Sequence, residues 1–358
     1  MRNFGSNGGD PAKPSLKDDG IREPRAIHGG ETADTTQDAV SAEERILTNP
    51  LFGEPVIKTG PAREAYHSLR ERLLGGISGF TVLGQRRMDL PGTLRVMRHY
   101  LMQEYPHLAV YEHLVSRRSP RTESDALSNL LHSMGHRILR GSHDAKIARL
   151  LNMQEEQALV SGSPLSIWVI HNAELLDVAQ CKVLLEMRGH LELKGIRLFL
   201  VHGAHVDSFM TRIRKLVRGL SQSELRTLFG SVLALRGLSG LQEYAEVLTE
   251  IDTLMVSQES PVTWTQALLP KAYEGGFRLT SQAPALHAAI LTRNPDGAFP
   301  NRALFDVIRS VMSTSARYDS PNLKIPHELW AQAVTTVMGV GSSYLQSDSG
   351  LQSSIHAR

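Results

Sequence analysis

The sequence predicts an α/β fold in which five parallel strands form a sheet with helices on both faces, followed by a small all-helical domain. Three observations support this prediction. Short apolar runs typical of strands alternate with longer runs of helical periodicity between about residues 80 and 235. Parallel strands need a crossover of about a dozen residues, and the intervening helical runs are long enough to supply it. After Pro261 the strand pattern stops, and amphipathic helical patterns follow.

The strands and helices of the predicted sheet domain are assigned from hydrophobic periodicity. Each expected strand is a short, mostly apolar run, as in a sheet buried on both faces. These strands are Phe80–Gly84, Leu108–Val115, Leu165–Ile170, Gly195–Val201 and Ser231–Leu235. The expected helices carry apolar residues at i, i+3, i+4 and i+7. They are Gly92–Gln103, Glu123–Leu139, Lys146–Val160, Val178–Leu191 and Asp207–Val217.

Composition divides the chain into four parts. Residues 1–42 are rich in Gly, Pro, Asp, Thr and Ser, so they cannot bury enough apolar area to offset the entropy of ordering, and we expect a disordered arm. The sheet domain is expected at 43–257, the helical domain at 258–340, and a second disordered tail at 341–358. The helical domain should contain four helices, near Trp264–Tyr273, Ser281–Leu291, Asn301–Ala316 and His327–Met338.

Several protein classes are disfavoured by composition. No run approaches the roughly 18 apolar residues of a membrane span, and Met1–Asp10 lacks the apolar core of a signal peptide. The single cysteine, Cys181, excludes an internal disulfide and is expected to be a buried, inert thiol. We therefore expect a cytoplasmic protein. Residues 1–50 carry a net charge of −3 against +2 for the whole chain, which leaves a mildly basic remainder of +5.

The turn after the first predicted strand has the frame of a phosphate-binding loop without its chemistry. That loop, GxxxxGK[ST], needs a glycine, a lysine and a hydroxyl where this chain has Asp89, Leu90 and Pro91. The missing glycine would let backbone N–H groups wrap the phosphates, the missing lysine would neutralise their charge, and the missing hydroxyl would bind magnesium. In addition, Asp89 would place a carboxylate beside a bound phosphate. Read alone, the segment is also an ordinary strand-to-helix turn. Its positions are Gly84, Gln85, Arg86, Arg87, Asp89, Leu90 and Pro91.

The end of the third strand shows a similar loss. An active nucleotide hydrolase would carry two acidic residues there, one for magnesium and one to orient the attacking water. This chain has His171 and Asn172, which cannot take either role as a carboxylate would.

From Ser166 to His205 the sequence resembles the second half of the nucleotide domain in AAA+ transposition-regulator ATPases of the TnsC, TniB and MuB type. Ala173–Leu176 and Gly195–Gly203 match the two ends of that region, and Ser231–Leu254 is similar to the last core strand and following helix. Tyr273–Arg278 resembles the start of the lid, the small helical domain of these ATPases. The resemblance covers about residues 45–340 in order and spacing, while both diagnostic nucleotide motifs depart from it.

The resemblance implies an AAA+-like fold and a role in DNA transposition, but not ATP hydrolysis. The expected function is a pseudo-ATPase adaptor that bridges target DNA or a target-selecting protein to a transposase or an active AAA+ partner, as a homo- or hetero-oligomer and away from membranes. We expect no catalytic residue, no metal and no cofactor. The alternative is an active or nucleotide-binding ATPase that uses ATP and magnesium through an atypical loop.

The resemblance also assigns candidate roles to arginines. Arg212 and Arg214 are candidates for an arginine finger that reaches a neighbouring subunit, and Arg278 for a lid arginine. Separately, Arg212, Arg214, Lys215 and Arg218 could contact double-stranded DNA through its phosphates, without sequence preference. A solvated basic helix face remains the simpler interpretation, and Arg86 and Arg87 could hold an anion at a helix N-terminus.

A third function class is a metal-dependent or small-molecule hydrolase. His171, His202 and His205 follow or end neighbouring predicted strands and could meet at the edge of the sheet. The absence of a carboxylate at ligand spacing argues against a zinc site, and a chain with 15 histidines brings some together by chance.

Overall fold

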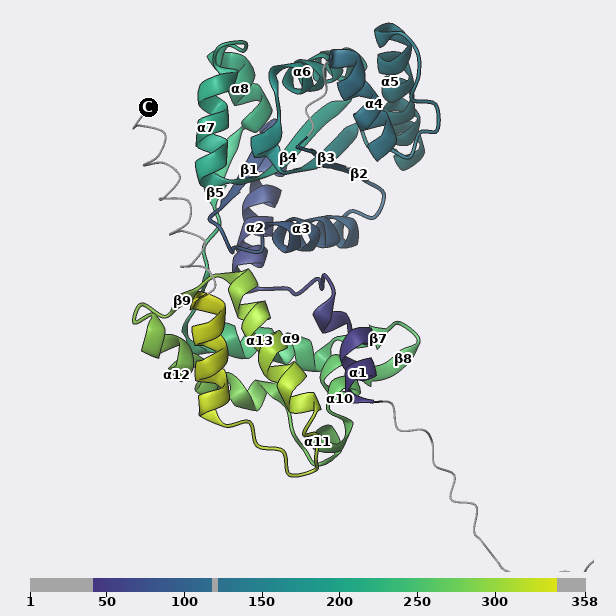
Figure 1. Cartoon of the computed structure of the whole chain (residues 1–358). Coiled ribbons are helices and arrows are strands. Elements are labelled where there is room, and N and C mark those ends of the chain that lie inside the picture. Colours follow the sequence, from purple (N-terminus) through teal and green to yellow (C-terminus); the bar gives the residue numbers. More distant parts are fainter. Residues whose placement is uncertain (1–40, 118–121, 340–358) are drawn as a thin grey trace, which may run out of the picture. The chain divides into compact units, whose positions relative to one another are not determined.

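The computed structural model describes residues 41–117 and 122–339 (Figure 1). The predicted arm, apart from Ser41 and Ala42, and the predicted tail 341–358 lie outside these residues.

A five-stranded parallel sheet forms the centre of the first domain, as the sequence predicts. Its strands lie in the order β2-β3-β4-β1-β5. All pairings are parallel, and the register places Gly84 opposite His205 and Leu114 opposite His171. Turns that follow β1, β2, β3 and β4 therefore meet at one carboxyl edge. The strands are β1 (Gly79–Gly84), β2 (Ala109–Leu114), β3 (Leu165–His171), β4 (Arg197–His205) and β5 (Ser231–Ala234).

Helices cover both faces of this sheet, and alternate strand residues explain why. On β3, Ile167 and Val169 pack into the apolar core on one face, whereas Trp168 and Ile170 pack into the core on the other. The first face is covered by α2 (Gly60–Leu74) and α3 (Leu90–Glu104). Residues from five helices line the second face: α4 (Glu123–Ser133), α5 (His143–Ser161), α6 (Val178–Leu193), α7 (Val206–Leu216) and α8 (Gln222–Phe229).

Local signals set several helix ends. α6 begins with a capping box, in which Asp177 accepts a hydrogen bond from the Gln180 backbone and the Gln180 side chain accepts one from the Asp177 backbone. α4 ends at Ser133, six residues before the predicted Leu139. Gly135 follows at φ 77°, a conformation that favours glycine and ends the helix.

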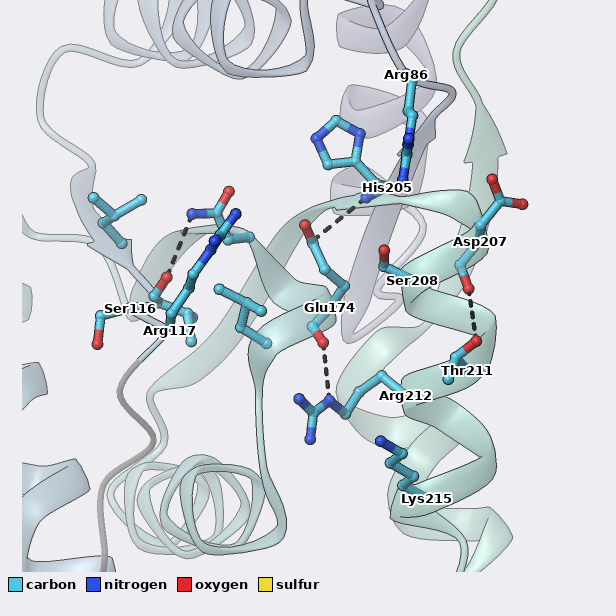
Figure 2. Close-up of a pocket in the computed structure, with 14 residues that line it drawn as sticks. Arg86, Ser116, Arg117, Glu174, His205, Asp207, Ser208, Thr211, Arg212 and Lys215 are labelled. Carbon is cyan, nitrogen blue, oxygen red and sulfur yellow. Dashed lines mark hydrogen bonds between the residues drawn. The ribbon is translucent and has the colours of Figure 1, made fainter. Parts of the chain in front are cut away.

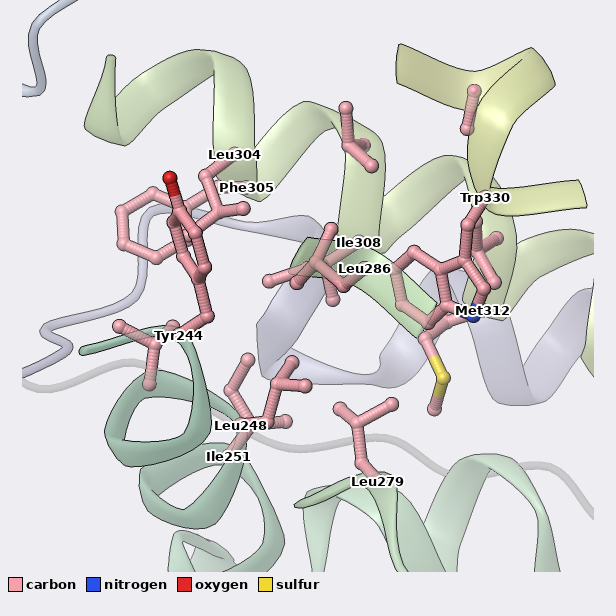
Figure 3. Close-up of a cluster of buried hydrophobic side chains, with 14 of the residues drawn as sticks. Tyr244, Leu248, Ile251, Leu279, Leu286, Leu304, Phe305, Ile308, Met312 and Trp330 are labelled. Carbon is pink, nitrogen blue, oxygen red and sulfur yellow. The ribbon is translucent and has the colours of Figure 1, made fainter. Parts of the chain in front are cut away.

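A second core holds the helical region together (Figure 3). Tyr244, Leu248 and Ile251 of α9 pack against residues of later helices and against Trp330, which is fully buried. Leu51 belongs to this core, so the segment before α2 packs with the helical region. The elements are α1 (Ala42–Thr48), η1 (Pro50–Phe52), α9 (Gly240–Thr253), α10 (Trp264–Leu268), α11 (Pro270–Glu274), η3 (Leu279–Gln282), α12 (Ala283–Arg293), α13 (Asn301–Ala316) and a helix at 327–339.

Two expectations for this region were wrong. Two short strands, β8 (Ser260–Thr263) and β9 (Ala298–Phe299), extend past the predicted end of the β pattern, because pairings of two to four residues are too short to show periodicity. β8 pairs with β7 (Met255–Ser257), and β9 pairs with β6 (Leu238–Ser239). The predicted helix Trp264–Tyr273 is split in two, since Pro270 starts α11 and has no backbone N–H to continue α10.

Candidate functional site

The turn after β1 ends in a helix that carries its own anion. Asp89 is the N-cap of α3, and its Oδ1 accepts a hydrogen bond from the Gly92 backbone at 3.1 Å. A Cβ at Gly92 would lie 1.8 Å from Asp89 Oδ2, so the carboxylate fits closely over the first turn. Helix N-termini attract anions because their first N–H groups are unpaired and the dipole is positive there. In α3 the protein supplies that anion itself.

The two residues after Asp89 have structural roles in the turn and in α3. Leu90 is 4% exposed and belongs to the core between α3 and the sheet. Pro91 takes an early helical position, where its missing N–H is not needed. Burial raises the pKa of the Asp89 carboxyl, although its hydrogen bond with Gly92 and the nearby arginines lower it. No side chain here can replace the lysine and hydroxyl of a phosphate loop.

The space above the α3 N-terminus is nearly closed. A cavity of about 70 Å³ remains, lined by residues 53–55 and by side chains of α3 and α13, including Asp89, Arg302, Phe305 and Arg309. Arg309 donates hydrogen bonds to the carbonyls of Leu51 at 2.7 Å and Gly53 at 2.9 Å, and Glu54 forms an ion pair with Arg95. Ligand pockets measure roughly 300–1,000 Å³, so a nucleotide does not fit without rearrangement.

At the end of β3, His171 contacts a carboxylate of the neighbouring strand β2. His171 Nε2 lies 3.5 Å from Glu112 Oε1 of β2, and Arg98 Nε of α3 lies 3.8 Å from the other oxygen of Glu112. The hydrogen bond from His171 is the main cause that lowers the pKa of Glu112. Asn172 turns the chain at φ 56° and its Nδ2 donates to the Val115 carbonyl at 3.4 Å. These residues tie β2 to β3.

A second and larger pocket, here called the basic pocket, lies at the same carboxyl edge (Figure 2). Its volume is about 740 Å³. It is lined by the turns after β1, β2 and β3, by the end of β4 and by one face of α7 from Asp207 to Lys215. Its charged side chains are four cations, Arg86, Arg117, Arg212 and Lys215, and two carboxylates, Glu174 and Asp207.

Glu174 organises the centre of the basic pocket. Its Oε2 accepts a hydrogen bond from the His205 backbone at 3.4 Å, and its carbonyl accepts one from Arg212 Nε at 2.9 Å. His205 is the N-cap of α7 but makes no side-chain cap, and its buried Nδ1 has no hydrogen-bond partner among the described residues. Unlike α3, α7 therefore presents an uncapped N-terminus to a cavity.

The other basic residues predicted as candidates differ in their surroundings, and only some of them line the basic pocket. Arg214 and Arg218 are exposed but do not line the basic pocket, whereas Arg212 and Lys215 do. Arg278 folds onto its own turn: its guanidinium lies 3.6 Å from the Tyr273 ring centroid and donates to the carbonyls of Tyr273 and Phe277. Arg87 donates to the sulfur of Met338 at 3.9 Å, and its carbonyl accepts from the Arg302 backbone.

The three predicted histidines have different surroundings. His171 pairs with Glu112, while His202 is fully buried with its ring 4.9 Å from that of Phe229. Burial lowers the pKa of His202 to about 3. No group of three or more His, Cys, Asp or Glu side chains in the described ranges is arranged to hold a metal. Cys181 is buried, and burial raises the pKa of its thiol to about 12.

Sequence reasoning missed the residues that close the α3 N-terminus. Arg302 and Arg309 are seven residues apart on one helix, a spacing that places them on the same face and could have been noticed. Glu54, Glu112 and Arg117 gave no local signal, because each reaches its site only through the tertiary fold.

No helix within the described part of the chain is both long and apolar enough to span a membrane. No protein-family model matches the sequence, and a comparison with curated proteins found no match either.

A comparison with solved structures found distant similarity to several proteins. Cdc6p from Pyrobaculum aerophilum is 15% identical with a TM-score of 0.47, over 76% of this chain and 66% of that chain. The Aeropyrum pernix ORC1 protein, solved in complex with DNA, is 15% identical with a TM-score of 0.47, over 82% and 69%. Domain III of Thermotoga maritima DnaA is 13% identical with a TM-score of 0.42, over 80% and 94%. The chain thus spans about two thirds of the first two. The predicted architecture, a five-stranded parallel sheet with helices on both faces followed by a mainly helical region, is confirmed by the structure itself.

Proposed function

We propose that this chain is a non-hydrolysing protein of AAA+-like fold that acts by binding, as an adaptor in DNA transposition. It links target DNA or a target-selecting protein to a transposase or to an active AAA+ partner. The observation that carries the loss of hydrolysis is the α3 N-terminus, where the Asp89 carboxylate takes the place of a phosphate and a cavity of about 70 Å³ remains.

The energetic case for this loss has three parts. A phosphate at α3 would meet the Asp89 carboxylate at short range, and like charges repel by several kcal/mol when partly desolvated, at about 4 Å and an effective dielectric of about 20. It would also have to displace residues 53–55, which Arg309 holds through two hydrogen bonds. Finally, His171 and Asn172 offer no carboxylate at the end of β3 for magnesium.

The adaptor role rests on the family resemblance and on the exposed cations of α7 and its C-terminal end. Arg214, Lys215 and Arg218 are exposed, so they are available to DNA phosphates or to a neighbouring subunit. Arg214 is the better finger candidate, because Arg212 is already bonded to the Glu174 carbonyl and Arg278 to its own turn. These contacts would be insensitive to DNA sequence and sensitive to salt.

The test is a calorimetric titration of the full chain with ATP, with and without magnesium. We expect no magnesium-dependent binding. Binding in the micromolar range that requires magnesium and weakens in the cavity-lining variant Arg302→Gln would overturn the proposal in favour of a nucleotide-binding ATPase with an atypical loop. The exposed variant Arg293→Gln on α12, outside this cavity, serves as the matched control.

A further inference from the structure

The basic pocket has an excess of positive charge that the lost nucleotide site does not explain. Among the described residues, no ion pair involves Arg86, Arg117 or Lys215. Of the two carboxylates, Glu174 is 9% exposed and already accepts the His205 backbone N–H. In Figure 2 the Asp207 carboxylate points away from Arg212 and Lys215. Within the part of the chain that the structure describes, these three cations therefore form no ion pair with a carboxylate.

The N-terminus of α7 adds to this positive field. α7 has 11 residues and begins without a side-chain cap, so its first backbone N–H groups have no partner within the helix. Ser208 and Thr211 bring hydroxyl groups to the same wall. A helix N-terminus beside arginine side chains favours an anion with several oxygens.

Size and shape point to a phosphate-containing ligand. The volume of about 740 Å³ lies within the usual range of ligand pockets, about 300–1,000 Å³. The cations come from three separate segments, the turn after β1, the end of β2 and α7, so donors approach from several directions. A tetrahedral phosphate offers acceptors in such directions, whereas a single planar carboxylate would satisfy fewer of them.

We propose that the basic pocket binds phosphate, with one group at the N-terminus of α7 near Arg86 and Arg212. Arg117 and Lys215 contact this or an adjoining phosphate of the same ligand. The phosphate comes either from a DNA backbone or from a small polyphosphate, and the inference rests on the proposed function only in naming DNA as one source. It differs from the exposed cations of α7 because Arg86 and Arg117, which come from other segments, line the pocket, whereas Arg214 and Arg218 lie outside it.

The test uses the full chain and two probes: a labelled 20-base-pair duplex of arbitrary sequence, followed by fluorescence anisotropy, and inorganic tripolyphosphate, followed by calorimetry. The pocket variant is Arg86→Gln with Arg117→Gln, which leaves the cations of α7 unchanged. The matched control is Lys182→Gln with Arg226→Gln, which removes the same charge from exposed positions outside the pocket and outside the cations available to DNA on α7 and at its C-terminal end. All four side chains are exposed, so both variants should melt like the unmodified protein.

We expect the pocket variant to weaken at least one probe by about 10-fold or more, and the control to change both by about twofold or less. Loss confined to DNA assigns the backbone as the source, and loss confined to tripolyphosphate assigns a small polyphosphate. Equal weakening by both variants, or no binding of either probe, overturns the inference. Magnesium-dependent ATP binding that the pocket variant leaves unchanged would instead contradict only the proposed function.

Discussion

Two helices begin at the carboxyl edge of the same sheet, and their N-termini are treated in opposite ways. α3 is capped by its own Asp89 carboxylate, and residues of α13 and the segment 53–55 close the space above it. α7 has no side-chain cap and faces the open basic pocket of about 740 Å³. Under the proposal above, the same sheet edge closes one helix N-terminus to anions and keeps another open to them. The position after β1 is filled by the protein's own carboxylate, and the uncapped helix N-terminus follows the neighbouring strand, β4.

The largest expected consequence of the filled α3 N-terminus is that the protein does not hydrolyse ATP. Loss of an arginine finger alone slows phosphoryl transfer by roughly 10³ to 10⁵, and here the lysine, hydroxyl and acidic pair are all missing. We expect no phosphate release above background when the full chain is incubated with ATP and magnesium. Turnover that depends on magnesium and disappears in Asp89→Lys would contradict this expectation.

The comparison is sharpened by making α7 resemble α3. His205→Asp places a carboxylate at the N-cap of α7, where the backbone already has the extended conformation of a cap. The new carboxylate should compete with phosphate and weaken tripolyphosphate or DNA binding by about 10-fold, or about 1.4 kcal/mol. His205→Gln, which adds no charge, is the matched control. Equal binding by the two variants would show that the α7 N-terminus does not contact phosphate.

Two buried histidines of the sheet, His202 and His113, make the stability of the protein depend on pH, so binding at α3 and α7 has to be compared at neutral pH. Burial lowers the pKa of His202 to about 3 and that of His113 to about 4, against about 6.5 in an unfolded chain. Between these values the unfolded state binds protons that the folded state does not. Stability therefore falls as the pH drops below about 6.5, by about 1 kcal/mol per pH unit for each histidine.

Urea unfolding of the full chain between pH 4.5 and 7 checks this slope. His202→Leu should flatten the dependence on pH, because it removes one of the two groups. An unchanged slope in that variant would mean that His202 is protonated in the folded protein, contrary to its burial.

A smaller effect tests the cap of α3. Asp89→Ala removes the acceptor for the Gly92 N–H and should lower the free energy of unfolding by about 1 kcal/mol. Asp89→Asn keeps an acceptor and removes a partly buried charge, so it should cost little. Urea unfolding at neutral pH compares the two. Equal destabilisation would indicate that charge, and not the cap hydrogen bond, is what Asp89 contributes.

The sheet was predictable from the sequence because its signals are local. Runs such as Leu165–Ile170 are mostly apolar and separated by helical patterns, which leaves few alternatives to a parallel sheet. The altered loop could also be read directly, since Asp89, Leu90 and Pro91 are adjacent. The two-residue strands of the helical region could not, because only their partners define them.

The basic pocket was predictable only in part. Arg212 and Lys215 could be named because they share one helix, but Arg117 follows a different strand and meets them only after folding. The closure of the α3 N-terminus by Arg309 depends on contacts more than 250 residues apart in the chain. Such pairings leave no pattern in a single sequence.

The most direct test of the central claim is a crystal structure of the full chain with tungstate, a phosphate analogue with a strong anomalous signal. We expect an anomalous peak in the basic pocket beside Arg212 and the N-terminus of α7, and none at the N-terminus of α3. A peak beside Gly92, with the Asp89 carboxylate displaced and the basic pocket empty, would contradict it.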